Sequence, residues 1–194
     1  MILSDACLIR SGFSARSRLE PDNSGMLALP QSCVTAVGEL DPTAVTRVSG
    51  SIGSPQHIVH PGDVLLRSRG STVSAWAIDD SLEEPAVALL PLYILRPTAD
   101  ILDAGYLAWL LMQPDAQAHF ARGLVGSNIQ MIKKPTIAAL PLSMLPPLRN
   151  QRQIAAIAQM TAREASLQTR LITLQQQRMA LRLRAHASHH DRNS

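Results

Sequence analysis

The stretch PLSMLPPLRNQRQIAAI, residues 141–157, divides the chain into two parts of different character. Pro146–Pro147 favours a stiff, extended connector through which no helix can continue, because proline lacks a backbone N–H and restricts the residue before it. From Gln151 to about His186 the chain has no glycine or proline and is rich in Gln, Arg, Ala and Leu. These residues are good helix formers, so the sequence predicts a long helix that begins just after the double proline.

Apolar side chains recur along this helix at alternating spacings of three and four residues, as in the seam of a coiled coil. Glu164 and Arg178 are the two polar seam positions, and such positions help to set register. A helix of about 36 residues is roughly 54 Å long, which exceeds the diameter of a domain of about 150 residues. We therefore expect another helix to cover the stripe, although packing on its own domain is the alternative. The residues expected to make dimer or partner contacts are Ile154, Ile157, Met160, Leu167, Leu171, Leu174 and Leu181.

The first 100 residues predict a β-rich domain, because short Val, Ile and Leu segments alternate with Gly, Pro, Asn and Asp. The strands expected are Cys7–Arg10, Gln31–Val37, His57–Val59, Val64–Arg67, Ser74–Ile78 and Ala88–Leu95, with loops at Leu19–Gly25 and Arg47–Pro55. Two short helices should follow, one capped by Asp103 and one that starts at Pro114 and stops at Gly123. The predicted fold is α+β, with a β-rich globular domain over 1–148, which the resemblance described below implies is the target-recognition domain, a helix over 149–187 and a disordered tail over 188–194.

The positive charge of the 194-residue chain is concentrated in the helix. Residues 1–150 hold 11 Lys and Arg against 13 Asp and Glu, whereas residues 151–194 hold 7 Arg against 2 acids. The N-terminal domain is therefore almost neutral, and any nucleic-acid contact there must come from local clusters of cations.

Motifs for catalysis, nucleotide binding or metal binding are missing from the sequence. It has no GxxxxGK[ST], GxGxxG or GxSxG pattern, and the HxxH pair His57 and His60 has no further ligand at zinc spacing. The tail histidines His186, His189 and His190 fit a solvated chain end better than a metal site. We expect a binding protein without a cofactor. An enzyme with an unrecognised active site is a remote alternative.

Two cysteines, Cys7 and Cys33, cannot form a disulfide framework and fit free thiols in a reducing cytoplasm. The N-terminus carries Asp5 and no long apolar run, so it does not resemble a signal peptide. The longest mainly apolar run, Ala86–Leu95, is too short to span a bilayer. The sequence therefore predicts a cytoplasmic protein with no membrane contact.

Three segments, in order, resemble the specificity (S) subunits of type I restriction–modification systems. They are LSDACLIRSGFS near the N-terminus, HPGDVLLRSRGSTVSAWAI in the middle, and GSNIQMIKKPTIAALPLSMLPPLRNQRQIAAI before the helix. In that family a target-recognition domain reads one half of a split DNA sequence, and a long helix docks the modification subunits. The resemblance implies double-stranded DNA, a DNA methyltransferase and a restriction subunit as partners. Because this chain has one such domain and one such helix, it resembles a half-subunit that would pair with itself, antiparallel.

Three polar clusters are the candidate DNA contacts, since arginine can grip guanine or phosphate and amides can read adenine. The candidates are Arg67, Arg69, Ser71 and Thr72 after one strand, Ser127, Asn128, Gln130, Lys133 and Lys134 in a later turn, and Arg16 and Arg18 near the N-terminus. An ordinary solvated surface is the alternative for each. A different function for the whole chain also stays open, namely an assembly or regulatory protein whose domain no longer recognises DNA.

Overall fold

The computed structural model consists of an α+β body followed by a long C-terminal helix, as the sequence predicts. It describes residues 1–15, 19–50, 52–70, 72–80, 82–125, 131–143 and 145–190, of which 124–125 and 185–190 are described as backbone only. Contacts divide the chain into two units, Met1–Ala158 and a second that begins at Gln159. The first unit is called the body below, and it includes the first turns of the long helix.

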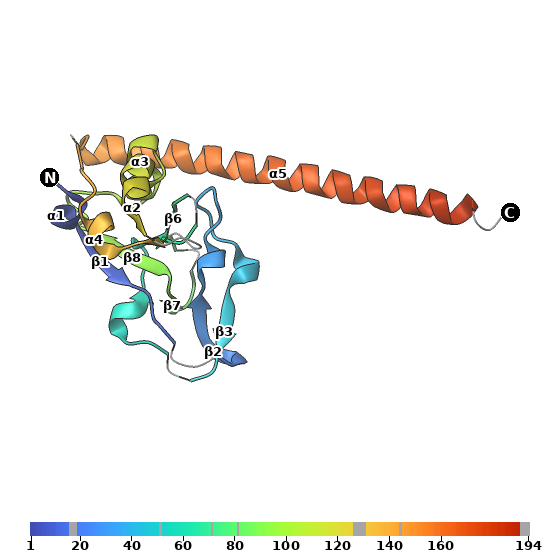
Figure 1. The fold of residues 1–194 in the computed structure, drawn as a ribbon, viewed down its shortest axis with the longest axis horizontal. Helices are drawn as coiled ribbons and strands as arrows, with labels where there is room; N and C mark the ends of the chain where they lie inside the picture. The colour runs from blue at the N-terminus through green and yellow to red at the C-terminus, as the bar shows by residue number, and fades with distance from the viewer. Residues whose placement is uncertain are drawn as a thin grey trace. The chain divides into compact units, whose positions relative to one another are not determined.

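The elements of the body are short, whereas the C-terminal helix is long (Figure 1). The helices are α1 (Leu3–Ala6), α2 (Ala104–Leu111), α3 (Pro114–Arg122), α4 (Lys134–Ala138) and α5 (Leu148–His190), with 3-10 turns η1 (Gln31–Cys33), η2 (Pro42–Ala44) and η3 (Pro55–His57). The strands are β1 (Cys7–Ser11), β2 (Pro21–Leu29), β3 (Thr46–Val48), β4 (Ile58–Val59), β5 (Val64–Arg67), β6 (Ser74–Ala77), β7 (Ala86–Ala88), β8 (Leu92–Pro97), β9 (Leu124–Val125) and β10 (Met131–Ile132).

Two four-stranded sheets and a layer of helices form the body. The first sheet has the order β1-β8-β5-β6 with antiparallel neighbours, and the second has the order β3-β2-β7-β4. Val64, Leu66 and Leu95 of the first sheet pack against Leu107 and Phe120 of the helices. Leu65, Ile94 and Trp76 on the opposite face pack against residues of the second sheet. Strands β5, β6 and β8 of the first sheet are therefore buried on both faces, which explains why they are almost continuously apolar, whereas the edge strand β1 exposes Leu8.

Four predicted strands match the structure to within one residue, since Cys7–Arg10 corresponds to β1 and His57–Val59 to β4. Two other strand predictions are wrong, and each of the two predicted loops is partly strand, since Arg47 and Val48 belong to β3. Val64–Arg67 is β5, and Ser74–Ile78 is β6 with one residue fewer. The expected loop at Leu19–Gly25 is instead the start of β2, which pairs with β3 and runs parallel to β7. Gly25 fits that strand because its α-carbon lies against the Val48 carbonyl, where no side chain has room.

The segment Gln31–Val37, expected as a strand, forms the 3-10 turn η1 and only an isolated bridge between Val34 and Leu40. The segment Ala88–Leu95, expected as one strand, is divided between β7 and β8, which belong to different sheets. The β8 strand begins immediately after Pro91, since proline cannot donate to a sheet ladder.

The helix boundaries follow the predicted signals. The Asp103 carboxylate accepts a hydrogen bond from the Tyr106 backbone N–H at 2.9 Å and so caps α2. Pro114 occupies the first turn of α3, and Gly123 is its C-terminal cap. The helix α5 starts at Leu148, directly after the double proline, and continues to His190, so residues 188–190, expected in the tail, are helical. The sequence interpretation missed α4, whose start at Lys134–Pro135 has a proline in its first turn.

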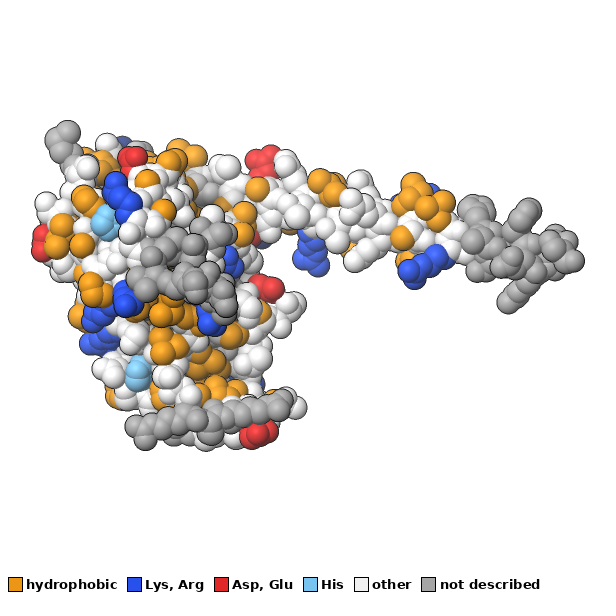
Figure 2. All heavy atoms as spheres, in the orientation of Figure 1, with side chains coloured by type: hydrophobic (Ala, Val, Ile, Leu, Met, Phe, Trp, Pro, Cys, Tyr) orange, Lys and Arg blue, Asp and Glu red, His pale blue; other side chains and the backbone are white. Residues whose placement is uncertain are grey.

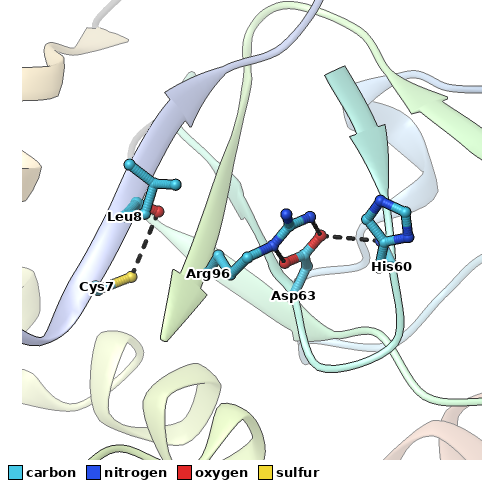
Figure 3. Close-up of polar contacts among 5 residues, drawn as sticks. All are labelled: Cys7, Leu8, His60, Asp63 and Arg96. Carbon is cyan, nitrogen blue, oxygen red and sulfur yellow. Dashed lines mark hydrogen bonds and ion pairs between the residues drawn. The ribbon is translucent and has the colours of Figure 1, made fainter. Parts of the chain in front are cut away.

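The buried Asp63, directly before β5, forms an ion pair with the partly exposed Arg96 of β8 (Figure 3). The Asp63 side chain is 1% exposed and accepts bonds from Arg96 Nε at 2.6 Å and Nη2 at 2.7 Å. It also accepts a bond from the His60 backbone N–H at 2.9 Å, which fixes the turn before β5. Hydrogen bonding to Asp63 raises the pKa of Arg96. The carboxylate is thus fully paired, as a buried charge must be.

Among the residues that the structure describes, no helix is both long enough and apolar enough to cross a membrane.

Candidate nucleic-acid interface

The structure brings two of the predicted clusters together, although more than 60 residues separate them in the sequence. Arg69 forms an isolated antiparallel bridge with Met131, and the Ile132 N–H donates to the Ser68 carbonyl at 2.9 Å. Lys133 and Lys134 come directly after this contact and are exposed. The segment after β5 and the segment after β10 therefore present their cations on one region of the body.

Arg67 and Arg69 differ in how they are held. Arg67 is half-buried, and its Nη1 donates to the Val34 carbonyl at 3.4 Å. Its Nε is buried without a hydrogen-bond partner among the described residues. Arg69 is exposed, as is Thr72. Arg69 can therefore reach a ligand without rearrangement, whereas Arg67 forms part of the support beneath the loop.

Hydrogen bonds with Tyr93 and His119 hold the backbone at and just after Lys133 and Lys134. Burial raises the pKa of the Tyr93 hydroxyl, and a hydrogen bond with the Lys134 backbone opposes that shift. His119 bonds through Nε2 to the Thr136 carbonyl at 2.8 Å, and because a carbonyl can only accept, that ring nitrogen carries the proton. The two lysines are thus flexible side chains on a fixed backbone.

Arg122 is a further cation beside this cluster that the sequence interpretation did not select. It ends α3 and is exposed, and the next residue, Gly123, lies directly against the Thr136 side chain. One sequence signal could have indicated it, since no Asp or Glu occurs between Asp115 and Glu164. We call Arg69, Arg122, Lys133 and Lys134 the basic cluster.

The predicted contact residues of α5 divide into two groups. Ile154 is half-buried and packs against the hydrophobic core of the body. The other six are exposed by more than half, namely Ile157, Met160, Leu167, Leu171, Leu174 and Leu181. Three more exposed apolar residues, Ile172, Met179 and Leu183, lie between or beyond them. Figure 2 shows separate patches of hydrophobic side chains along the helix, and α5 therefore presents exposed apolar side chains on its surface.

Neither a scan against protein-family models nor a search of curated proteins finds a match. Solved structures do match. A chain from a study of complex assembly and conformational transition of the type I R-M system has 21% identity and a TM-score of 0.58, over 87% of this chain and 39% of that one. The HsdS subunit from Thermoanaerobacter tengcongensis has 20% identity and a TM-score of 0.54, over 86% and 37%. The type I restriction–modification S subunit from M. genitalium has 13% identity and a TM-score of 0.51, over 81% and 37%.

The fold is that of a type I specificity subunit. The chain spans about two fifths of the length of the structures it matches. The likeness confirms the α+β fold and the S-subunit resemblance, which rested on three ordered sequence segments. At these identities it carries over no individual DNA-contacting residue.

Six of the predicted DNA-contacting residues lie outside the described residues of this specificity-subunit fold: Arg16, Arg18, Ser71, Ser127, Asn128 and Gln130. Their flanking strands are described. The end of β1 pairs with β8 at Ser11 and Tyr93, and the end of β5 pairs with β8 at Arg67 and Leu92. The segments that follow β1 and β5 therefore leave the first sheet at the same end.

The basic cluster can bind phosphate and base edges. Arginine donates in a planar fork that suits phosphate or guanine, and lysine supplies a mobile point charge. The ion pairs found among the described residues, Arg47–Glu84, Arg96–Asp63 and Arg152–Asp103, use none of its members. Several Lys and Arg side chains lie on the face of the body visible in Figure 2, with hydrophobic surface between them.

Proposed function

We propose that this chain is a sequence-specific DNA-recognition subunit of a type I restriction–modification complex. Its body reads one half of a bipartite site in double-stranded DNA, and its helix directs a DNA methyltransferase and a restriction subunit to that site. The single observation that carries the proposal is the basic cluster, built from segments far apart in sequence on a specificity-subunit fold. In this assignment residues 1–148 recognise DNA and residues 149–187, which lie in α5, dimerise and dock partners.

Local charge, rather than net charge, supports DNA binding by the body. Residues 1–150 carry a slight acidic excess, so no global field attracts nucleic acid. Three members of the basic cluster, Arg122, Lys133 and Lys134, come from a stretch of sequence without acidic residues, between Asp115 and Glu164. The fourth member, Arg69, joins them in the folded structure through its bridge to Met131. Contacts to phosphate supply much of the affinity of DNA-binding proteins, and they need only a few well-placed cations.

The exposed apolar surface of α5 supports a role in assembly. We propose that two copies pair through their helices, antiparallel, so that two bodies related by a two-fold axis read two half-sites. A closed two-fold contact of this kind requires a self-complementary surface. The seam positions Glu164 and Arg178 would bring opposite charges close in such a pair and help to set its register. The protein acts in the cytoplasm in this proposal and catalyses no reaction itself.

Charge reversal of the basic cluster tests the proposal. The variant carries Arg69→Glu, Lys133→Glu and Lys134→Glu, and a control variant carries Arg163→Glu, Arg170→Glu and Arg182→Glu, which lie on α5 but not at its seam positions. A pool of random DNA duplexes is incubated with the wild-type protein and with the methyltransferase whose gene lies nearest to its own. Selection from this pool should enrich a bipartite site. Fluorescence anisotropy on that site should show strong loss for the cluster variant and retained binding for the control. Each lost phosphate contact should also make the negative slope of log K against log salt shallower by about 0.9.

The assembly or regulatory alternative makes a different prediction in the same experiment. A wild-type protein that binds the methyltransferase but enriches no DNA sequence would overturn the recognition proposal and support that alternative. Equal DNA binding by the wild type and the cluster variant would overturn the assignment of the basic cluster.

A further inference from the structure

Gln151 is one of the few buried polar side chains among the described residues, and it lies in the first turn of α5. It is 1% exposed. Its Oε1 accepts from the Asp103 N–H at 2.9 Å, and its Nε2 donates to the carbonyls of Ile101 at 3.0 Å and Pro146 at 2.9 Å. One side chain therefore joins the start of α5 to the segment before α2 and to the proline connector.

Only an amide satisfies all three of these backbone groups. Gln offers two N–H donors and a carbonyl acceptor on one planar group, which matches two carbonyls and one N–H. A glutamate at this position would turn an acceptor oxygen toward two carbonyl oxygens. A leucine of similar size would leave three buried backbone groups without a partner, which is unfavourable.

The neighbours of Gln151 strengthen the same junction. Ile154 and Ala155 pack against the hydrophobic core of the body. A β-carbon added to Gly105 would lie 2.9 Å from the Ala155 β-carbon, so α2 and α5 touch where only glycine fits. Asp103, whose N–H bonds to Gln151, also caps α2 through its side chain. The first turns of α5 and the start of α2 are thus one packed junction.

We propose that Gln151 is the positioning residue that couples the partner-binding helix to the DNA-reading body. Its side chain ties the beginning of α5 to the start of α2, so that a change in the conformation of one helix end changes the conformation of the other. This inference rests on the proposed function only for its DNA readout. The junction itself can be tested without DNA.

The test compares Gln151→Leu and Gln151→Glu with Gln153→Leu, a matched control two residues along the same helix, where the side chain is exposed. Hydrogen exchange of the whole chain is measured over 101–105 and 148–158. Both Gln151 variants should speed exchange there by about tenfold or more, while the sheet strands β5 and β8 keep their protection. The control should leave all of these segments unchanged.

A DNA readout separates positioning from a general loss of structure. On the site selected by the wild type, Gln151→Leu should reduce the preference for two half-sites over one by about tenfold, since linked binding depends on how the two modules are connected. Its affinity for a single half-site should stay within about twofold of wild type. A comparator, Leu107→Ala, which destabilises the core of the body, should not change the preference.

The exchange and DNA-binding measurements can each overturn the proposed role of Gln151. Unchanged exchange at the junction in both Gln151 variants overturns the proposal, as does an equal loss of affinity for one and two half-sites. A wild type that binds no DNA refutes the proposed function, while the exchange measurement still decides whether Gln151 holds the junction.

Discussion

The ion pair between Asp63 and Arg96 allows a prediction in which the more exposed partner is the more costly one to remove. Asp63 is 1% exposed, whereas the Arg96 side chain is 40% exposed. Replacing Arg96 with Met leaves a buried carboxylate whose one remaining partner among the described residues is the His60 N–H. Breaking a buried pair in this way costs about 3–5 kcal/mol, and the partial exposure of Arg96 favours the lower end.

Replacing Asp63 with Asn should cost less. The amide oxygen still accepts one bond, and the released guanidinium can turn toward water because it is already partly exposed. The loss of charge-assisted bonds then costs about 2 kcal/mol. The double variant should cost about 3 kcal/mol, less than the sum of the two, because the stranded charge is gone.

Urea unfolding followed by tryptophan fluorescence measures these differences, since both tryptophans, Trp76 and Trp109, lie in the body. In thermal unfolding followed by the same fluorescence, Arg96→Met should lower the Tm of the body by roughly 6–12 °C. Arg47→Met, which removes the half-buried partner of the exposed Glu84 together with a bond to the Gly25 carbonyl, is the control and should cost less than Arg96→Met, because water can solvate the Glu84 carboxylate. A larger cost for Asp63→Asn than for Arg96→Met, or strict additivity in the double variant, would refute the reasoning.

Three further predictions concern other parts of the chain. Burial raises the pKa of Cys7 and of Cys33 to about 12, so the folded state holds these protons more tightly than the unfolded chain. Stability should therefore fall as the pH rises above about 9, and urea titrations of the double Cys→Ala variant should show a smaller fall. Gly105→Ala should destabilise the body by about 1–2 kcal/mol in the same titration, because the added methyl group overlaps α5, and a stability equal to wild type would contradict that contact. Leu171→Lys with Leu174→Lys should leave the unfolding midpoint of the body unchanged but weaken self-association in sedimentation, and an unchanged association constant would exclude this face as the contact.

Local chemistry explains why part of the fold was predictable from sequence. A carboxylate caps the helix that follows it, a proline pair stops helix formation, and an apolar run between turns becomes a buried strand. These effects act within a few residues, so Asp103, Pro114, Pro146–Pro147 and the strand Val64–Arg67 could be assigned correctly.

Pairing between distant segments explains the errors. PDNSG favours a turn by composition, yet β2 starts there because β3 and β7 offer partners for its backbone. The apolar residues of Gln31–Val37 suggested a strand, but the structure pairs only Val34, and Cys33 and Val34 serve the core from a 3-10 turn. Neither outcome depends on the residues of the segment alone, since strand pairing is decided by the neighbours.

The sequence by itself determined the kind of protein: a near-neutral α+β domain, a long helix with an apolar stripe, and cations at the ends of particular segments. Only the tertiary structure decided which of those cations meet, because the bridge from Arg69 to Met131 joins segments that no local pattern relates. It also decided that the buried amide of Gln151 ties the helix to the body, a role that depends on carbonyls about 50 residues away in one case. Local conformational preferences depend on the residues of one short segment. Long-range contacts form only when the folded chain brings distant segments together, so a single segment does not determine them.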